Sequence, residues 1–171
     1  MEPYVEVRRR VSPTQRGMVT DKTASNFILK PIGIIHSGFR TTEQIRSSQK
    51  VRGEIEVYPE YEPGLKDIDG FSHLFVIWGF HLSDEERLTA HPPYYPRQER
   101  GVFATRSPRR PNRLGLTVVR LLKREDRYLQ VKGLDMAEGS PVFDLKPYIP
   151  KDQIMEAEFG WLDNVEGEET P

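Results

Sequence analysis

The residues of this chain best suited to bind an anion gather between positions 101 and 117. An apolar run leads into a loop with four arginines and two prolines, and then into a second apolar run: Arg106, Pro108, Arg109, Arg110, Pro111 and Arg113. Proline restricts the backbone and lowers the entropic cost of holding the arginines in place. Guanidinium groups form paired hydrogen bonds with phosphates and carboxylates. The pattern predicts an anion-binding loop, with a solvated surface loop as the alternative.

A second stretch, residues 133–148, has side chains that suit a small ligand with an ammonium group and hydroxyls. The turn Gly139-Ser140-Pro141 lies among three acids, Asp135, Glu138 and Asp144. Backbone amides at such a turn and the carboxylates beside it could hold that ligand. The alternative is a polar hairpin tip whose Asp and Ser side chains bond to their own backbone.

Positive charge is concentrated around the first stretch, although the chain is nearly neutral. The 25 basic and 26 acidic residues give a net charge of −1. Residues 97–127 hold ten basic and three acidic side chains, a net charge of +7. Residues 151–171 hold one basic and seven acidic side chains, a net charge of −6. A local excess of positive charge indicates an anionic partner on one face. The alternative is that the arginines bridge to acids near the C-terminal end.

Several classes of site are disfavoured by what the chain lacks. It has no cysteine, so thiolate nucleophiles, disulfides and cysteine-ligated metals are excluded. The glycine fingerprints of dinucleotide and P-loop sites are absent, and the four histidines form no metal-binding motif, so we expect no metal. No apolar run approaches the roughly 20 residues of a membrane helix, and we see no secretory signal. We therefore expect a cytoplasmic protein with no membrane contact.

Many short apolar runs at fairly regular spacing predict an all-β barrel or sandwich. The predicted strands cover residues 27–36, 53–58, 73–80, 101–105, 114–123 and 128–133, and residues 141–145 follow a predicted turn at 138–140. In the run 114–123, Leu116, Val118 and either Val119 or Leu121 compete for the core. Residues 1–26 are interpreted as a flexible arm and residues 151–171 as an acidic segment. The proline- and aromatic-rich residues 89–100 are too apolar for solvent, which predicts a homodimer.

Four separated motifs follow one another along residues 28–150. They read Ile32-Gly33-Ile34-Ile35-His36-Ser37, Asp69-Gly70-Phe71-Ser72-His73-Leu74, Ala104-Thr105-Arg106-Ser107-Pro108 with Arg110-Pro111-Asn112 and Gly115-Leu116, and Glu138-Gly139-Ser140-Pro141 with Asp144-Leu145-Lys146-Pro147-Tyr148. In this order they resemble the TsaA-like or TrmO family, the tRNA N6-methyladenosine methyltransferases. Arg113 stands where that family commonly has proline.

The resemblance implies a single, mainly all-β barrel domain over residues 27–150, with loop excursions and few short helices. It implies S-adenosylmethionine as cofactor and, as substrate, the threonylcarbamoyl-adenosine beside the anticodon of threonine tRNA, methylated on N6. It also implies a homodimer with the cofactor pocket near the subunit interface. By motif position, the cofactor contacts are expected from Gln49, His73, Leu74, Arg106, Leu116, Leu134, Asp135, Glu138, Gly139, Ser140 and Pro141.

The implied reaction needs a proton acceptor, because the urea-like N6 is a poor nucleophile until its proton leaves. Asp144, Asp135, Glu138 and His73 are candidates. We rank Asp144 first as the catalytic residue, with Tyr148 positioning the base. A turn cap at Asp144 and a core histidine at His73 are the structural alternatives.

We expect Arg109, Arg110 and Arg113 to hold the tRNA backbone. Two rival functions remain: a non-catalytic RNA-binding barrel and a sensor that binds S-adenosylmethionine without transferring its methyl group.

Overall fold

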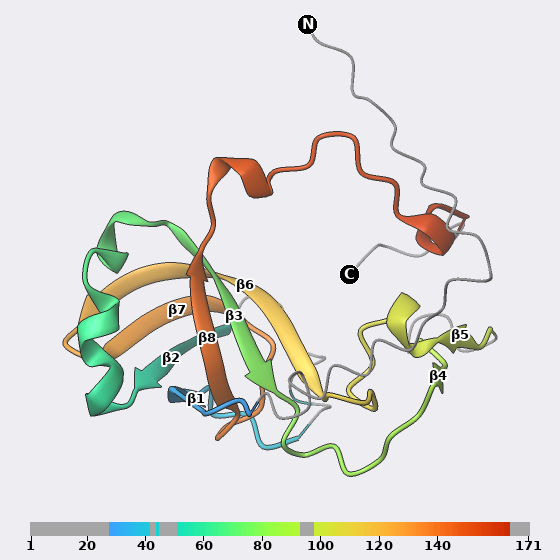
Figure 1. Cartoon of the computed structure of the whole chain (residues 1–171), viewed down its shortest axis with the longest axis horizontal. Helices are drawn as coiled ribbons and strands as arrows, with labels where there is room; N and C mark the ends of the chain where they lie inside the picture. Colours follow the sequence, from blue (N-terminus) through green and yellow to red (C-terminus); the bar gives the residue numbers. More distant parts are fainter. Residues whose placement is uncertain (1–27, 42–43, 45–50, 93–97, 165–171) are drawn as a thin grey trace, which may run out of the picture.

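The fold is a closed barrel of six antiparallel strands, which confirms the predicted all-β class (Figure 1). The computed structural model describes residues 28–41, 44, 51–92 and 98–164; the predicted arm 1–26 lies outside them. Around the barrel the strands follow the order β1-β2-β7-β6-β3-β8. Their bounds are β1 Gly33–His36, β2 Val51–Val57, β3 His73–Gly79, β6 Leu114–Glu125, β7 Tyr128–Leu134 and β8 Pro141–Pro147.

Strand β3 lies between β6 and β8 and supplies the centre of the core. Its β-branched and aromatic residues suit a pleated, half-buried surface. Leu74, Val76 and Trp78 point inward and are buried, whereas the residues between them are half-buried on the outer side. This alternation is the period of two expected of a strand with one face on a core.

Strand β6 turns Leu116 and Val118 outward, so of the residues that competed for the core it is the alternative with Val119 that the structure shows. Leu116 is 57% exposed and Val118 is 44% exposed, whereas Val119 is fully buried. Gly115 faces inward opposite Trp78, and a Cβ at this position would come within 2.3 Å of the indole ring. The indole ring of Trp78 fills the space where a side chain at position 115 would lie. The first inward-facing position of β6 therefore has room only for glycine.

Two predicted strands are corrected by the structure. Residues 101–105 form no five-residue strand: β5 is Arg100–Gly101, pairs with β4 at Thr89–Ala90, and is followed by the 3-10 helix η5, Val102–Ala104. The described residues before β1 are also not in a strand, and Ile28 is 77% exposed.

Four more 3-10 helices flank the barrel strands. Between β2 and β3 lie η3, Pro59–Leu65, and η4, Ile68–Gly70; after β8 come η6, Pro150–Asp152, and η7, Gly160–Asn164. No helix among the described residues has the length and hydropathy to cross a membrane.

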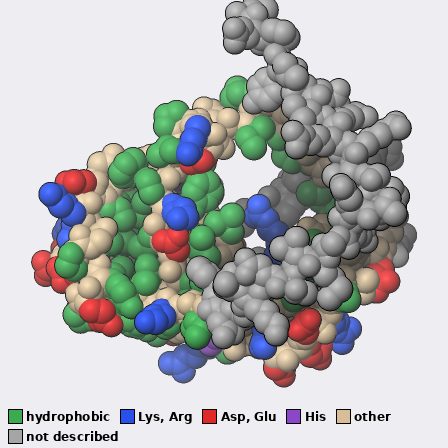
Figure 2. Space-filling view, in the orientation of Figure 1, with side chains coloured by type: hydrophobic (Ala, Val, Ile, Leu, Met, Phe, Trp, Pro, Cys, Tyr) green, Lys and Arg blue, Asp and Glu red, His purple; other side chains and the backbone are tan. Residues whose placement is uncertain are grey.

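The segment after β8 leaves the barrel and reaches the β4–β5 hairpin (Figure 1). Trp161 Nε1 donates a hydrogen bond to the Ala104 carbonyl at 2.9 Å, and the Arg100 guanidinium lies 5.2 Å from the centre of the Trp161 ring. The space-filling view shows an opening between this segment and the barrel (Figure 2). The apolar side chains of the segment, Ile154 and Met155, are largely exposed.

Candidate active site

Asp135 is held by a relay of two hydrogen bonds that starts in the core. Trp78 Nε1 donates to Thr117 Oγ1 at 3.0 Å, and Thr117 donates to Asp135 Oδ1 at 2.7 Å. Desolvation raises the pKa of the Asp135 carboxyl, although the residue stays accessible on one side, while Thr117 and the charge of Arg106 act in the opposite direction. The structure thus places Arg106 and Asp135, two residues predicted to contact the cofactor, within electrostatic reach of each other.

Glu138 joins the end of β1 to the turn before β8. Its Oε1 lies 3.0 Å from His36 Nδ1, and its Oε2 accepts hydrogen bonds from the backbone N–H groups of Ser37 and Gly38, each at 2.8 Å. The Gly38 N–H is the largest cause of the lowered pKa of Glu138. Both oxygens therefore have protein partners, so this predicted cofactor residue also fixes the local structure.

His36 lies between two carboxylates. Its Nε2 is 2.9 Å from Glu56 Oε2, and the hydrogen bonds with Glu56 and then Glu138 raise the pKa of the imidazole. Arg127 Nη1 donates to the other Glu56 oxygen at 2.7 Å. The cluster therefore holds two acids against two cationic groups beside the predicted cofactor turn.

The turn before β8 has the geometry that requires glycine. Ser140 N–H donates to the Ala137 carbonyl at 3.2 Å, and Gly139 has a φ of 79°, a conformation that glycine adopts without strain. The Ser140 side chain is fully buried, and its hydroxyl lies 3.3 Å from His81 Nδ1. The N–H groups of Glu138 and Gly139 likewise donate within the protein, to the carbonyls of Phe39 and Ile35, so the amides of this turn stabilise the local fold.

Two other residues predicted to contact the cofactor lie in the core. Leu74 is fully buried in β3, and Leu134 is 2% exposed at the end of β7. Only their backbone can meet a ligand. Leu116 is exposed on the outer face, opposite Ile77, and Gln49 lies outside the described residues.

An irregularity in β8 turns two neighbouring residues, Phe143 and Asp144, to the outside of the barrel. Asp144 is opposite Ile77, and Val142 is opposite Trp78, so Phe143 is the extra residue of a β-bulge. Bulges re-aim side chains and are frequent next to active sites. Asp144 accepts a hydrogen bond from the Leu145 N–H at 2.9 Å and pairs with Lys146 at 2.7 Å.

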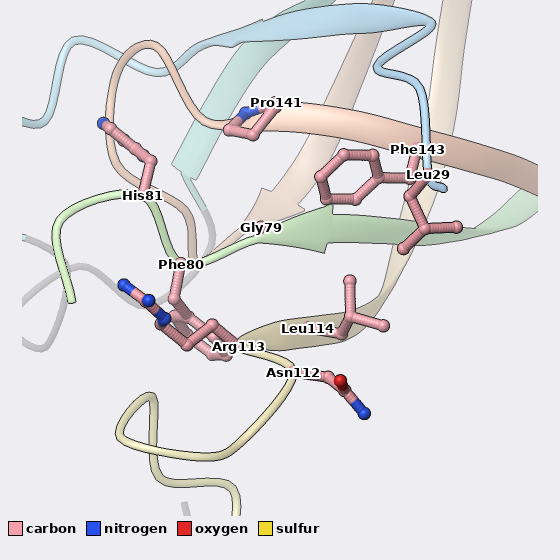
Figure 3. Close-up of a pocket in the computed structure, with 9 residues that line it drawn as sticks. All are labelled: Leu29, Gly79, Phe80, His81, Asn112, Arg113, Leu114, Pro141 and Phe143. Atoms are coloured by element: carbon pink, nitrogen blue, oxygen red, sulfur yellow. The ribbon is translucent and has the colours of Figure 1, made fainter. Parts of the chain in front are cut away.

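A cavity of about 240 Å³ lies beside this bulge. Figure 3 shows the ring of Phe143 on one side of it and the side chains of Phe80, Asn112 and Arg113 on the other. Pro141 also lines it, so the cavity joins the predicted cofactor turn to the arginine loop.

Tyr148 belongs to a separate group of side chains at the other end of β8. Its ring centre lies 6.5 Å from that of His73 and 5.4 Å from that of Phe75. Four residues of extended chain separate Tyr148 from Asp144, roughly 13 Å between their Cα atoms. The structure therefore does not bring the two predicted catalytic residues to one point.

The arginine loop is closed by one of its own arginines. Arg110 donates hydrogen bonds to the carbonyls of Thr105 at 2.7 Å, Val102 at 2.9 Å and Ser107 at 3.1 Å. Of the other arginines predicted to bind RNA, Arg109 lies 3.5 Å from Glu85, and Arg113 donates to the Ser83 carbonyl.

Sequence reasoning missed Thr117, Trp78 and His36 as parts of this site. His36 lies in the first family motif, but no role was assigned to it, and each of the three acts on a residue of another strand or turn, up to 102 positions away in the case of His36 and Glu138. Among the described residues, no group of three His, Cys, Asp or Glu side chains could hold a metal ion.

Comparison with known proteins identifies one family over most of the barrel. The model of the tRNA-methyltransferase O N-terminal domain matches residues 34–153. A crystal structure of TrmO from Pseudomonas aeruginosa superposes with a TM-score of 0.65 at 31% identity, covering 79% of this chain and 62% of that one.

Sequence relatives are named as binding proteins or enzymes. This chain is 41% identical over 139 residues to a probable S-adenosyl-L-methionine-binding protein of Pyrococcus abyssi, covering 78% of this chain and 75% of that one. It is 36% identical over 136 residues to a tRNA (adenine(37)-N6)-methyltransferase of Rattus norvegicus, covering 72% of this chain but 31% of the rat protein.

Proposed function

This chain belongs to the tRNA-methyltransferase O family of S-adenosylmethionine-dependent enzymes, and we propose that it methylates N6 of the threonylcarbamoyl-adenosine beside the anticodon of a threonine-type tRNA. The observation that carries the proposal is the arrangement of Arg106, Asp135 and the bulged strand β8 around one end of the barrel. The reaction takes place in the cytoplasm, where tRNA is processed.

Arg106 and Asp135 fit the amino-acid end of S-adenosylmethionine, which carries a carboxylate and an ammonium group. A guanidinium can hold a carboxylate through two parallel hydrogen bonds. The Asp135 carboxylate, oriented by Thr117 at 2.7 Å, accepts hydrogen bonds from an ammonium. When bound, the cofactor supplies a methyl group on a positively charged sulfur.

The cavity beside Phe143 receives the target adenine. Aromatic rings stack on bases that have left the RNA helix, and an asparagine amide can both donate to and accept from an adenine edge. Phe143 and Asn112 offer these groups at the cavity wall. Asp144 lies next to Phe143 on the outer face, and its carboxylate takes the N6 proton as N6 gains the methyl group.

The tRNA backbone is held by Arg109, Arg110 and Arg113, and Tyr148 contacts the RNA farther along β8. Arg110 contributes mainly by fixing the loop through its three carbonyl contacts. Arg109 and Arg113 are exposed and reach the polymer. Contacts of this kind position the RNA without reading its sequence.

A second copy of the chain completes the assembly. The strand register places Phe75 beside Val118 and Ile77 beside Leu116, which makes an apolar patch on the outer face of β3 and β6. Exposed apolar patches of this kind commonly mark interfaces. A two-fold dimer covers this patch and buries at least about 1,000 Å². Light scattering of the wild type and of Val118→Glu tests it: a dimer and a monomer, respectively, are expected.

Methyl transfer to purified threonine tRNA, with and without its threonylcarbamoyl group, tests the proposed reaction. We expect transfer only to the modified tRNA. Calorimetry with S-adenosylmethionine separates the rival functions: an RNA-binding barrel does not bind it, and a sensor binds it but transfers nothing. Either outcome refutes the proposal.

Three substitutions separate the proposed catalytic role of Asp144 from cofactor binding by Asp135 and Arg106. Asp144→Asn should lower kcat by 10²- to 10⁴-fold, the usual contribution of a general base, with cofactor affinity unchanged. Asp135→Asn and Arg106→Ala should weaken cofactor binding instead. Asp69→Asn, an exposed acid on η4, is the control and should change neither quantity.

A further inference from the structure

Three cationic side chains form a row across the outer surface of the barrel. The register pairs Arg52 of β2 with Lys132 of β7, and Lys132 with Arg120 of β6. Arg120 is in turn opposite His73 of β3. The flanking residues of these strands are buried in alternation, so the three side chains point away from the core. We call Arg52, Lys132 and Arg120 the basic row.

The basic row carries a repulsion that the described part of the protein does not relieve. Directly opposite side chains on antiparallel strands have Cβ atoms about 4.5–5.5 Å apart, and like charges at that spacing are destabilising. Among the described residues, none of the three cations forms an ion pair. The nearest acid in register is Glu54, which stands in the next row, opposite Gln130. An external anion would therefore stabilise this surface.

The linear shape of the row indicates an extended polyanion. Neighbouring strands lie about 4.8 Å apart, so Arg52 and Arg120 are separated by roughly 10 Å. A single small anion would need side chains that converge, whereas successive phosphates of a nucleic acid can each meet one cation. The row also ends at His73, whose ring contacts Tyr148, and aromatic rings offer stacking surfaces for unpaired bases.

The arginine loop cannot supply the whole contact with RNA. Its Arg110 is committed to three backbone carbonyls, and Arg109 faces Glu85 at 3.5 Å. The basic row, by contrast, has no such partners among the described residues. We propose that the basic row is a second RNA-binding surface, which holds the phosphate backbone of the tRNA on the barrel wall and leads it to the His73 end of β3. This proposal rests on the proposed tRNA substrate.

Salt-dependent binding of tRNA tests the proposal. The triple variant Arg52→Gln, Arg120→Gln, Lys132→Gln is compared with Lys30→Gln, Lys66→Gln, Lys151→Gln, which removes the same charge from three exposed positions outside the barrel strands. Affinity for a threonine tRNA is measured by fluorescence anisotropy between about 50 and 300 mM KCl. Each lost phosphate contact lowers the log–log salt slope by about 0.7–0.9. The basic-row variant should therefore lose about two units of slope and bind at least tenfold more weakly at low salt.

The control variant should keep nearly the wild-type slope. Equal slopes and affinities in the two triple variants would overturn the proposal. If the triple variant does not fold, the single variant Lys132→Gln tests the same proposal. Its log–log salt slope should fall by about 0.7–0.9, and an unchanged slope would contradict the proposal.

The methyl-transfer readout keeps the two proposals apart. A wild-type protein that binds tRNA but transfers no methyl group refutes the proposed enzyme, and a flattened slope in the basic-row variant still supports the RNA surface. If the wild-type protein does not bind tRNA at about 50 mM KCl, the proposal of a second RNA-binding surface is wrong.

Discussion

The hydroxyl of Thr117 donates a hydrogen bond to the Asp135 carboxylate at 2.7 Å and accepts one from the Trp78 indole at 3.0 Å. Thr117 is on β6, and Asp135 directly follows β7, the neighbouring strand. Because the indole is buried, its position fixes the hydroxyl, and the hydroxyl selects one orientation of the exposed acid. A packed core residue thus determines where a surface charge points.

Thr117→Val should weaken S-adenosylmethionine binding roughly tenfold, or about 1.4 kcal/mol. Valine has nearly the shape of threonine but cannot hold the Asp135 carboxylate, and it leaves the Trp78 N–H without its acceptor. Calorimetry measures the change. Thr89→Val is the control, since it removes another hydroxyl–carboxylate bond, the 2.6 Å contact with Glu99 on the β4–β5 hairpin. Equal cofactor affinity in both variants would show that the relay does not position Asp135.

His36 should make the stability of the barrel depend on pH. Its pKa is raised above 6.5 in the folded state, so its contribution is complete below pH 6.5 and is lost as pH rises through the raised value. The pKa values of Glu56 and Glu138 are lowered from 4.5, so their contributions are present above pH 4.5 and are lost as pH falls through the lowered values. The cluster therefore stabilises the fold most between about pH 4.5 and 6.5.

Urea unfolding of the wild type and of His36→Gln between pH 6 and 9 tests this expectation. The midpoint of the wild type should fall over this range by more than that of the variant, because glutamine does not titrate. His81→Gln serves as the control, since the His81 ring lies 3.3 Å from the Ser140 hydroxyl and pairs with no carboxylate of the described residues. Parallel pH profiles for wild type and His36→Gln would contradict the assigned role.

Arg110→Lys should loosen the arginine loop. The guanidinium reaches three carbonyls at once, whereas an ammonium cannot reproduce that planar set of donors. The free energy of unfolding should fall by about 1.5–3 kcal/mol, the range for hydrogen bonds to charged groups. Hydrogen exchange of the amides of residues 102–107 should speed up. Arg109→Lys, which changes an exposed ion pair, should cost at most about 1 kcal/mol and leave exchange unchanged.

Gly115→Ala should destabilise the barrel by about 1–3 kcal/mol or more, because the new Cβ would meet the Trp78 ring. Urea unfolding gives the size of the effect, and near-UV circular dichroism reports any displacement of the indole. Gly64→Ala is the matched control, since a Cβ there would have no atom within 4 Å. A variant at 115 as stable as the one at 64 would mean that the ring moves aside without cost.

Short apolar runs at fairly regular spacing were enough to predict the all-β class and most of the strands, but they left a barrel and a sandwich open, and the family resemblance indicated the barrel. The run 73–80 was interpreted correctly as a strand because it is short, almost continuously apolar and rich in Val, Ile and aromatic residues. The same reasoning could not decide which residues of β6 face the core, and the structure shows that Leu116 and Val118 point outward. Hydropathy alone does not indicate that the Trp78 ring occupies the inner space beside Gly115.

The site was harder to derive than the fold, because its geometry comes from registers between distant strands. Motifs identified Arg106 and Asp135 but not the hydroxyl that orients the acid. Arg110 was expected to bind RNA, yet the loop folds back so that its own carbonyls surround the guanidinium. The basic row exists only because Arg52, Lys132 and Arg120 come into register across three strands.

The strand order has a consequence for the nascent chain on the ribosome. β3 pairs only with β6 and β8, and β2 pairs with β7, so the β1–β2 hairpin is the only barrel pairing available before residue 114 is made. The ring can close only after β8 is made, because β8 pairs with both β1 and β3. At 5–20 residues per second, translation from the end of β3 to the end of β8 takes roughly 3–14 s. During that time Leu74 and Val76 have no core to enter, and the unpaired edges of β3 can bind other chains, which makes this interval the one in which a chaperone matters most.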